Sequence, residues 1–313
     1  MKIVLALGGN ALLQRKEAQT LENQLKNIKE ASASIAKIAQ GNELVIVHGN
    51  GPQVGMLMEQ NATYHEVKPQ ISPYPMDVLS AETCGMIGCL LQQELLNADN
   101  TCSPISIITQ TLIEKADPAF ENLTKFVGPV YSKDEATKIM RERPNLQYKP
   151  DGDYYRQVVA SSMPKEIFEI SQINALLATG SIVIAGGGCG VPVYKDDDGM
   201  LNGVECVIDK DYTAELISEN IEADMFIILT DGDVCENFGT PEQRSIKQIS
   251  HVDLRRYNFP AGSMGPKVDA VCKFVQQTGR KAVIGSLYEL DMILKGRAGT
   301  SIKAECALEY YNS

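Results

Sequence analysis

The chain has 313 residues, of which 29 are basic and 40 acidic, so its formal net charge at pH 7 is −11. No block of lysine or arginine stands out, which argues against nucleic acid or an acidic membrane surface as the partner. A small anionic substrate would need lysines placed one by one, and these become the residues to follow. We expect one domain with two lobes, because α/β chains of this length often form one globule.

Eight cysteines are spread through apolar stretches with no CxxC pair, and we interpret them as free, buried thiols in a reducing compartment. They are Cys84, Cys89, Cys102, Cys189, Cys206, Cys235, Cys272 and Cys306. Met1 is followed directly by a strand pattern, so we expect no signal peptide. No apolar run approaches the roughly 20 residues of a membrane span, and we expect a cytoplasmic protein.

Two early strands each run into a glycine turn. Residues 2–7 lead into Gly8-Gly9-Asn10, and residues 44–47 lead into His48-Gly49-Asn50-Gly51-Pro52. Proline suits the first position of a helix, and the free amides of a helix start attract phosphate or carboxylate. Neighbouring parallel strands end at the same edge of a sheet, so we expect the two turns to form one anion cradle.

Between and after these turns, the apolar spacing predicts two helices and a third strand. The first helix is expected at 21–39, with Thr20 as its cap and Gly41 past its end. The second is expected at 76–96, where Ala81, Gly85 and Gly88 form a small-residue stripe suited to close packing against another helix, within the chain or across a subunit interface. The third strand is expected at 105–109.

Residues 114–164 break the pattern with five prolines and no long apolar run. We interpret this segment as a protruding subdomain or lid over a site, with an excursion of no catalytic role as the alternative. Regular alternation of strands and helices then resumes, which favours an α/β sandwich with a mostly parallel sheet. Helices are expected at 171–179, from about 210 to 220 and at 264–278, and strands at 182–185, 225–229 and 282–285, with a third glycine turn at 186–190.

Two lysines lie where helix electrostatics disfavours them. Lys210 opens one predicted helix and Lys267 lies in the first turn of another. A cation there is repelled by the helix dipole by up to about 1 kcal/mol. An anion between the two lysines would remove the conflict, which favours a polyphosphate site.

Several common nucleotide-binding and metal-binding motifs do not occur in the sequence. No Gly-Lys dipeptide occurs, so the chain has no P-loop, and neither HRD nor DFG is present. The third glycine turn has Val191 or Val193 where a dinucleotide fingerprint needs its last glycine. The three histidines show no metal-ligand spacing and no HExxH occurs. A phosphoryl-transfer site built from glycine turns and lysines remains.

Six motifs together resemble those of the carbamate kinases, within the amino-acid kinase family. They are LALGGNA from Leu5, HGNGPQVG from His48, DPAFENLTKFVGP from Asp117, VIDKD from Val207, LTDGDVCENFGTPEQ from Leu229 and AGSMGPKV from Ala261. The resemblance runs nearly end to end in the same order. HGNGPQVG and the threonine-lysine lid segment are the specific ones. The chain departs from the family's pattern at Leu123, Phe126, Cys189 and Thr240.

The resemblance implies a three-layer αβα fold that is usually a homodimer. It implies a carbamate-binding N-lobe at 1–180, which includes the lid at about 114–164, and a nucleotide-binding C-lobe at 181–313. The implied reaction is reversible phosphoryl transfer between carbamoyl phosphate and ADP, giving ATP and carbamate, with Mg2+ carried by the nucleotide phosphates. In the family this reaction commonly serves arginine breakdown by the arginine deiminase route.

The resemblance also carries roles over to matching positions. Lys125, Lys210, Asp211 and Lys267 would be catalytic, with Lys210 and Lys267 on the nucleotide phosphates, Asp211 orienting the lysines and Lys125 reaching in from the lid. The transferring group and carbamate would be held by Gly8, Gly9, Asn10, Gly49, Asn50 and Gly51. Nucleotide contacts would also come from Asp209, Thr230, Asp231 and Met264. No protein-held metal is implied.

Two other functions stay open at this point. One is another amino-acid kinase that acts on an amino-acid carboxylate or on UMP, for which the lid lysine is not needed. The other is a sensor that binds nucleotide without turnover.

Overall fold

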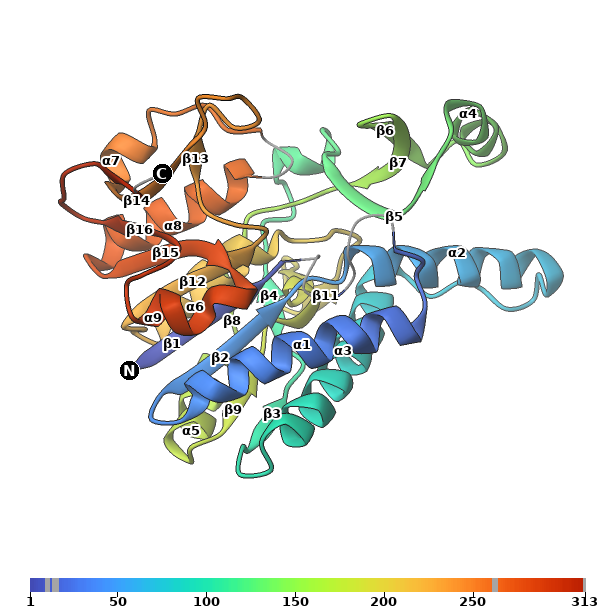
Figure 1. Cartoon of the computed structure of the whole chain (residues 1–313). Coiled ribbons are helices and arrows are strands. Elements are labelled where there is room, and N and C mark those ends of the chain that lie inside the picture. The colour runs from blue at the N-terminus through green and yellow to red at the C-terminus, as the bar shows by residue number, and fades with distance from the viewer. Residues whose placement is uncertain (9–11, 13–16, 261–263, 312–313) are drawn as a thin grey trace.

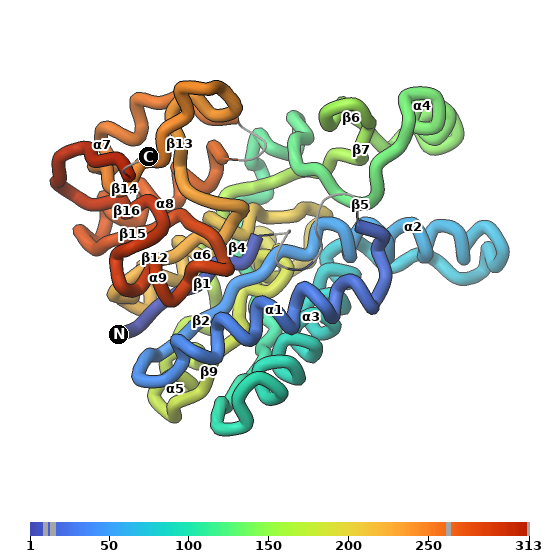
Figure 2. Tube along the Cα trace, viewed as in Figure 1, coloured from blue at the N-terminus to red at the C-terminus, as the bar shows by residue number. Residues whose placement is uncertain are grey.

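The computed structural model describes residues 1–8, 12, 17–260 and 264–311, and these are built around one large, mostly parallel sheet (Figures 1 and 2). Its ten strands follow the order β13-β14-β16-β15-β12-β1-β2-β9-β3, and β17 pairs with β14. The strands are β13 (Cys235–Glu236), β14 (Arg244–Ser250), β16 (Thr300–Lys303), β15 (Lys281–Ser286), β12 (Met225–Thr230), β1 (Lys2–Leu7), β2 (Glu43–His48), β9 (Ile182–Ile184), β3 (Pro104–Ser106) and β17 (Glu309–Tyr310).

Helices cover both faces of this sheet, because its central strands are apolar on both sides. In β1, Ile3, Leu5 and Leu7 pack into one core while Val4 and Ala6 pack into the other. The first core receives α1 (Leu21–Ala39), α3 (Met76–Ala98) and α9 (Leu290–Leu294). The second receives α5 (Ile170–Ala178), α6 (Lys210–Asn220), α7 (His251–Leu254) and α8 (Met264–Thr278). The expected three-layer αβα architecture is confirmed.

The segment expected to be a lid builds a small sheet of its own, drawn in green above α2 (Gly51–Val67) in Figure 1. Its strands pair in the order β5-β7-β6, and one helix follows β5. The elements are β5 (Lys125–Tyr131), α4 (Lys133–Glu142), β6 (Gln147–Asp151) and β7 (Tyr154–Val159). A second small sheet, β11-β10-β4-β8, joins the base of this segment to the hairpin after the third glycine turn. Its strands are β4 (Gln110–Leu112), β8 (Glu166–Ile167), β10 (Val191–Lys195) and β11 (Leu201–Gly203).

Strand β5 is pressed onto α2 through two glycines. A Cβ built on Gly55 would lie 2.0 Å from the Cα of Gly128, so only glycine fits at Gly55. Further along the same contact, the Tyr131 hydroxyl donates to Glu59 at 2.9 Å. The lid segment and α2 are therefore joined along several turns.

The observed elements follow the expected ones, with three differences. The third strand is shorter than expected and covers 104–106. Gly88 of the small-residue stripe packs against Ser106 of β3 rather than against a helix, and Gly85 is exposed. The segment that forms β13, β14 and α7 was not expected to be regular. Among the described residues, no helix has the length and apolar character that crossing a membrane requires.

Candidate active site

The glycine turns meet at the carboxyl ends of adjacent parallel strands. β1 pairs in parallel with β2 on one side and with β12 on the other, and β2 pairs in parallel with β9. The turn at Gly8, the turn at Gly49–Gly51 and the third glycine turn at 186–190 therefore lie along one edge of the sheet. This confirms the adjacency expected from the first two strands. Gly9 and Asn10 lie outside the described residues.

The turn before α2 lies directly under a lysine from the other half of the chain. A Cβ on Gly49 would be 3.5 Å from the Cδ of Lys210, which is van der Waals distance, so this turn and the lysine stem are neighbours. Gly51 begins α2, and the carbonyl oxygen of Phe126 in β5 lies 3.7 Å from the position of its Cβ. The helix start that was expected to bind an anion thus lies between Lys210 and the first residues of the lid strand.

The side chain of Asn50 has another task. Its amide nitrogen donates to Ser80 at 3.0 Å and to Thr83 at 2.8 Å, both on α3, and the residue is buried. The amide nitrogen therefore fixes the glycine turn onto α3. The Oδ1 of Asn50 is buried and has no hydrogen-bond partner among the described residues.

Asp209 joins the lid segment to the start of α6. One carboxylate oxygen accepts the backbone N–H of Asp211 at 3.0 Å and so caps the helix, as expected for aspartate at this position. The other accepts a hydrogen bond from Lys125 Nζ at 2.5 Å. Lys125 is the first residue of β5, so the lid lysine already reaches the edge of the C-terminal half.

Asp211 lies between the two lysines that were singled out by their helix positions. Lys210 Nζ contacts Oδ1 of Asp211 at 2.5 Å, and Lys267 Nζ contacts Oδ2 at 2.8 Å. Only 2% of the Asp211 side chain is exposed. The anion between the lysines is thus a carboxylate of the protein, and the helix-dipole argument alone does not require an external one.

The three lysines and two aspartates of this network leave one net positive charge in a chain of net charge −11. We call Lys125, Asp209, Lys210, Asp211 and Lys267 the lysine network. All five are close together and mostly out of water, where charge interactions are strong. The network offers a single anion a locally positive site against an acidic background.

Burial and ion pairing pull the pKa values of the network in different directions. Burial lowers the pKa of Lys210, but the Asp211 and Asp209 carboxylates outweigh it and hold this pKa above the usual value. Burial also lowers the pKa of Lys125, but the nearby carboxylates, Asp209 first among them, hold this pKa above the usual value. The pKa of Lys267 is lowered by burial and by the nearby Lys210. Burial also opposes the charge on Asp209, yet Lys125 and Lys210 hold its pKa well below the usual range.

A third glycine turn supports the site from below. The Thr213 hydroxyl of α6 donates to the carbonyl of Cys189 at 2.8 Å, and Cys189 has a positive φ of 77°. A Cβ on Gly187 would lie 2.6 Å from Nε2 of His48. Burial lowers the pKa of His48 to about 4, and its Nε2 has no hydrogen-bond partner among the described residues. A neutral imidazole therefore lies between the second and third glycine turns.

Other expected nucleotide contacts line the same edge without joining the lysine network. Thr230 is the last residue of β12 and Asp231 follows it, exposed. Met264 begins α8, the helix that carries Lys267, and packs against the core beneath it. Their role stays a prediction.

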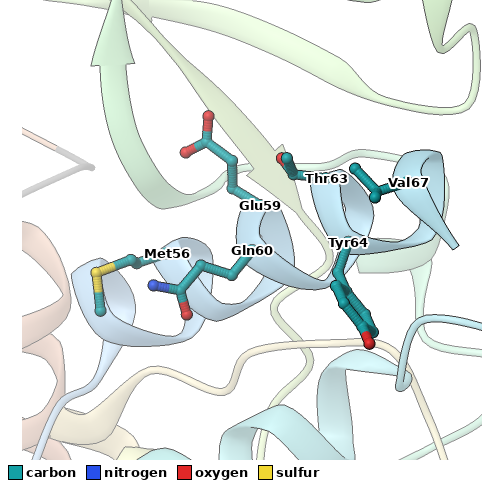
Figure 3. A pocket seen from close by; sticks show the side chains of 6 residues that line it. All are labelled: Met56, Glu59, Gln60, Thr63, Tyr64 and Val67. Carbon is teal, nitrogen blue, oxygen red and sulfur yellow. The ribbon is translucent and has the colours of Figure 1, made fainter.

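A hollow of about 460 Å³ lies along α2 itself. Figure 3 shows its six lining side chains, all from α2 and none from the lysine network. It is lined by Met56, Glu59, Gln60, Thr63, Tyr64 and Val67. We assign it no part in the chemistry of the lysine network.

Several residues that hold the glycine turns in place were not predicted from the sequence. Ser80 and Thr83 hold Asn50, and their spacing of three on one face of the predicted helix was the available signal. Thr213, which holds the third glycine turn, gave no signal.

The carboxylates of the network test how an Mg2+ ion fits this site. Asp209 and Asp211 each bind at least one lysine, and the described residues contain no group of three or more His, Cys, Asp or Glu side chains arranged for a metal. Mg2+ usually takes one or two carboxylates and completes its shell with phosphate oxygens and water. The residues present fit an ion that is carried mainly by the nucleotide.

Comparison with known proteins identifies relatives over the whole chain. The family "Amino acid kinase family" matches residues 1–286. A carbamate kinase of Haemophilus influenzae is 50% identical over 314 residues, covering 99% of this chain and all of the relative. The structure of a carbamate kinase from Giardia lamblia bound to citric acid superposes with a TM-score of 0.90 at 36% identity, covering 96% of this chain and 98% of that one. The same Giardia enzyme bound to AMP-PNP gives a TM-score of 0.86 with the same identity and coverage.

Proposed function

We propose which residues of this chain bind each substrate of its reaction. The chain belongs to the amino acid kinase family and is a carbamate kinase. It transfers a phosphoryl group between carbamoyl phosphate and ADP. The lysine network is the observation that supports the proposed site. It brings three cations and two carboxylates together at the edge of the sheet where the glycine turns lie.

In this proposal Lys210 and Lys267 bind the nucleotide phosphates, and Asp211 holds both ammonium groups at one point. The contacts at 2.5 and 2.8 Å support that arrangement. Phosphoryl transfer depends mainly on positioning and on stabilising charge on the transferring group. Carbamate is itself an anionic oxygen nucleophile, so no general base is needed.

The N-terminal half holds the other substrate in this proposal. Gly8, Gly49 and Gly51 present backbone at the edge where the strands end, and Lys210 passes directly over Gly49. Gly9, Asn10 and the backbone of Asn50 would complete this side. Lys125 contributes charge from the lid. Asp209, Thr230, Asp231 and Met264 would contact the nucleotide.

We propose that Mg2+ arrives with the nucleotide. When bound, it would neutralise part of the phosphate charge. The residues of the chain then act around it: Lys210 and Lys267 bind phosphate oxygens, and Asp211 keeps them in place.

Three further points rest on the resemblance to carbamate kinases: a homodimer, a cytoplasmic location and a place in arginine breakdown toward ATP. For the dimer, the exposed apolar side chains Val67, Ile71 and Tyr74 at the end of α2 and in the loop before α3 add support. Sedimentation of the purified protein tests this state directly.

The decisive experiment is ATP formation from carbamoyl phosphate and ADP by the purified protein. A panel with carbamate, acetylglutamate, glutamate, aspartate and UMP as acceptors of phosphate from ATP distinguishes a carbamate kinase from other members of the family. Turnover with carbamate alone supports the assignment. Preference for an amino acid or UMP overturns it, and nucleotide binding without turnover would point to a sensor.

A further inference from the structure

A second buried ion pair joins the same two helices that carry the network lysines. Lys273 Nζ of α8 donates to Glu215 Oε2 of α6 at 2.6 Å. The Glu215 side chain is completely buried, whereas one third of the Lys273 side chain is exposed. No contact with the lysine network is involved, so the chemistry proposed above leaves this carboxylate without a task.

The pair is the last of three polar contacts along the α6–α8 contact. The first is Lys267 with Asp211 in the lysine network. The second is the Tyr212 hydroxyl, which donates to Asp269 at 3.0 Å. On α6, Asp211 and Glu215 are four residues apart and so lie on one face, about 6 Å apart along the helix axis. A slide or rotation of α8 against α6 would break Glu215–Lys273 and move Lys267 relative to Lys210.

Glu215 has a high desolvation cost in its surroundings, so stability alone does not explain a carboxylate here. Burial raises its pKa to about 7, Lys273 acts in the opposite direction, and Glu219 one turn later adds like charge. Its Oε1 makes no hydrogen bond within the described part of the chain. Behind α6, Val4 of β1 and Phe226 of β12 pack into this core, and the Lys2 ammonium of β1 lies at the end of α6, where it donates to the Ile221 carbonyl at 2.8 Å. An apolar pair in place of Glu215 and Lys273 would be at least as stable, because the desolvation cost of a buried ion pair often exceeds its Coulombic gain.

We propose that Glu215 is a positioning residue for the phosphoryl transfer. With Lys273 it holds α6 and α8 at the offset where Lys210 and Lys267 converge on one carboxylate. Glu215 itself touches no substrate. The inference rests on the proposed function, since the lysines it positions are those assigned to the nucleotide phosphates.

The test is Glu215→Gln, which keeps the size of the side chain and removes its charge. Displacing reacting groups by about an ångström costs on the order of a hundredfold in rate, so a partial shift should lower kcat about tenfold. ADP affinity should weaken several-fold by calorimetry, while KM for carbamoyl phosphate, held by the N-terminal turns, should stay within about twofold. Lys273→Met should give the same loss, and the double variant should be no worse than either single variant.

The pH profile separates positioning from simple stabilisation. Above pH 7 Glu215 is charged and paired, and below it the carboxyl is protonated and the pair weakens. The ratio of parent kcat to Glu215→Gln kcat should therefore be large at pH 8 and fall toward one at pH 6. Titration of the substrates cancels in this ratio. Lys295→Met, which removes a pair with Asp291 whose side chains are more than half exposed, is the matched control and should change nothing.

These experiments distinguish failure of the proposed function from failure of the positioning role of Glu215. If the parent makes no ATP, the proposed function fails, and ADP binding by Glu215→Gln still decides the positioning role. If the variant has a lower melting temperature but parental kcat, ADP affinity and pH profile, the pair is only structural and the positioning role is refuted.

Discussion

Replacing Asp211 by asparagine tests the electrostatic account of the site most directly. The substitution keeps the shape of the side chain and removes the charge that two lysines share. Asp211 contacts Lys210 at 2.5 Å and Lys267 at 2.8 Å, and the side chains of the two lysines are only 9% and 15% exposed. Two neighbouring cations would then lack their common counter-charge.

The expected cost follows from this burial. Removing one partner of a buried ion pair typically costs 3–5 kcal/mol. The amide oxygen still accepts one hydrogen bond, so we take the lower end, about 3 kcal/mol in the free energy of unfolding. For a chain of this size that corresponds to a melting temperature lower by roughly 5 °C. Inorganic phosphate should return part of the loss, because it supplies an anion to the unpaired lysines.

The assay is thermal unfolding in the absence of nucleotide, repeated with phosphate and with sodium chloride at equal ionic strength. Asp291→Asn is the control, since its pair with Lys295 is exposed and should contribute less than about 1 kcal/mol. Asp211→Asn should be less stable than this control and gain more from phosphate than the parent does. Parental stability together with an equal response to both salts would refute the reasoning.

Three further expectations concern single side chains of the site. Lys210→Ala should lower the rate of ATP formation at least about a hundredfold, because removing a preorganised positive group from the transferring phosphoryl costs roughly 3 kcal/mol; near-parental synthesis would contradict its assignment. Lys125→Ala should lose most single-turnover activity while calorimetry shows ADP affinity within a few-fold, since its charge serves the transition state; a collapse of ADP binding would place Lys125 in the nucleotide site instead. Cys189 is buried and burial raises the pKa of its thiol, so a maleimide should modify it slowly and independently of ADP, whereas the exposed Cys89 should react at once; rapid modification that ADP blocks would show that Cys189 borders the nucleotide.

The convergence of glycine turns and lysines was predictable because it depends on short stretches and on one topological rule. A strand followed by a glycine turn is visible at Gly8 and at Gly49, and parallel neighbours put such turns at one edge. Lys210 and Lys267 could be singled out because a lysine at a helix start is electrostatically unfavourable.

The pairing within the site was not predictable from the chain alone. Lys125 contacts Asp209 from 84 residues away, and only the folded lid brings them together. The Asn50 amide points to α3 because Ser80 and Thr83 are there to accept it, which no local pattern states.

Strand β14 was missed for a different physical reason. Its fully buried residues Ile246 and Ile249 are three positions apart, a spacing that does not match the alternation of a regular strand. The register with β17 shifts between Ile246 and Gln248, and an irregularity of this kind disturbs the period of two.

The glycine contact between Gly55 and Gly128 determines how the site opens. The backbones of the lid strand and α2 are in direct contact here, and the Tyr131–Glu59 hydrogen bond lies beside this contact. We therefore expect the lid lysine and the helix start at Gly51 to travel together when substrates enter. This movement would separate Lys125 from Asp209, the ion pair between the lid strand and the C-terminal half. We therefore expect an anionic substrate to compete with Asp209 for the ammonium group of Lys125.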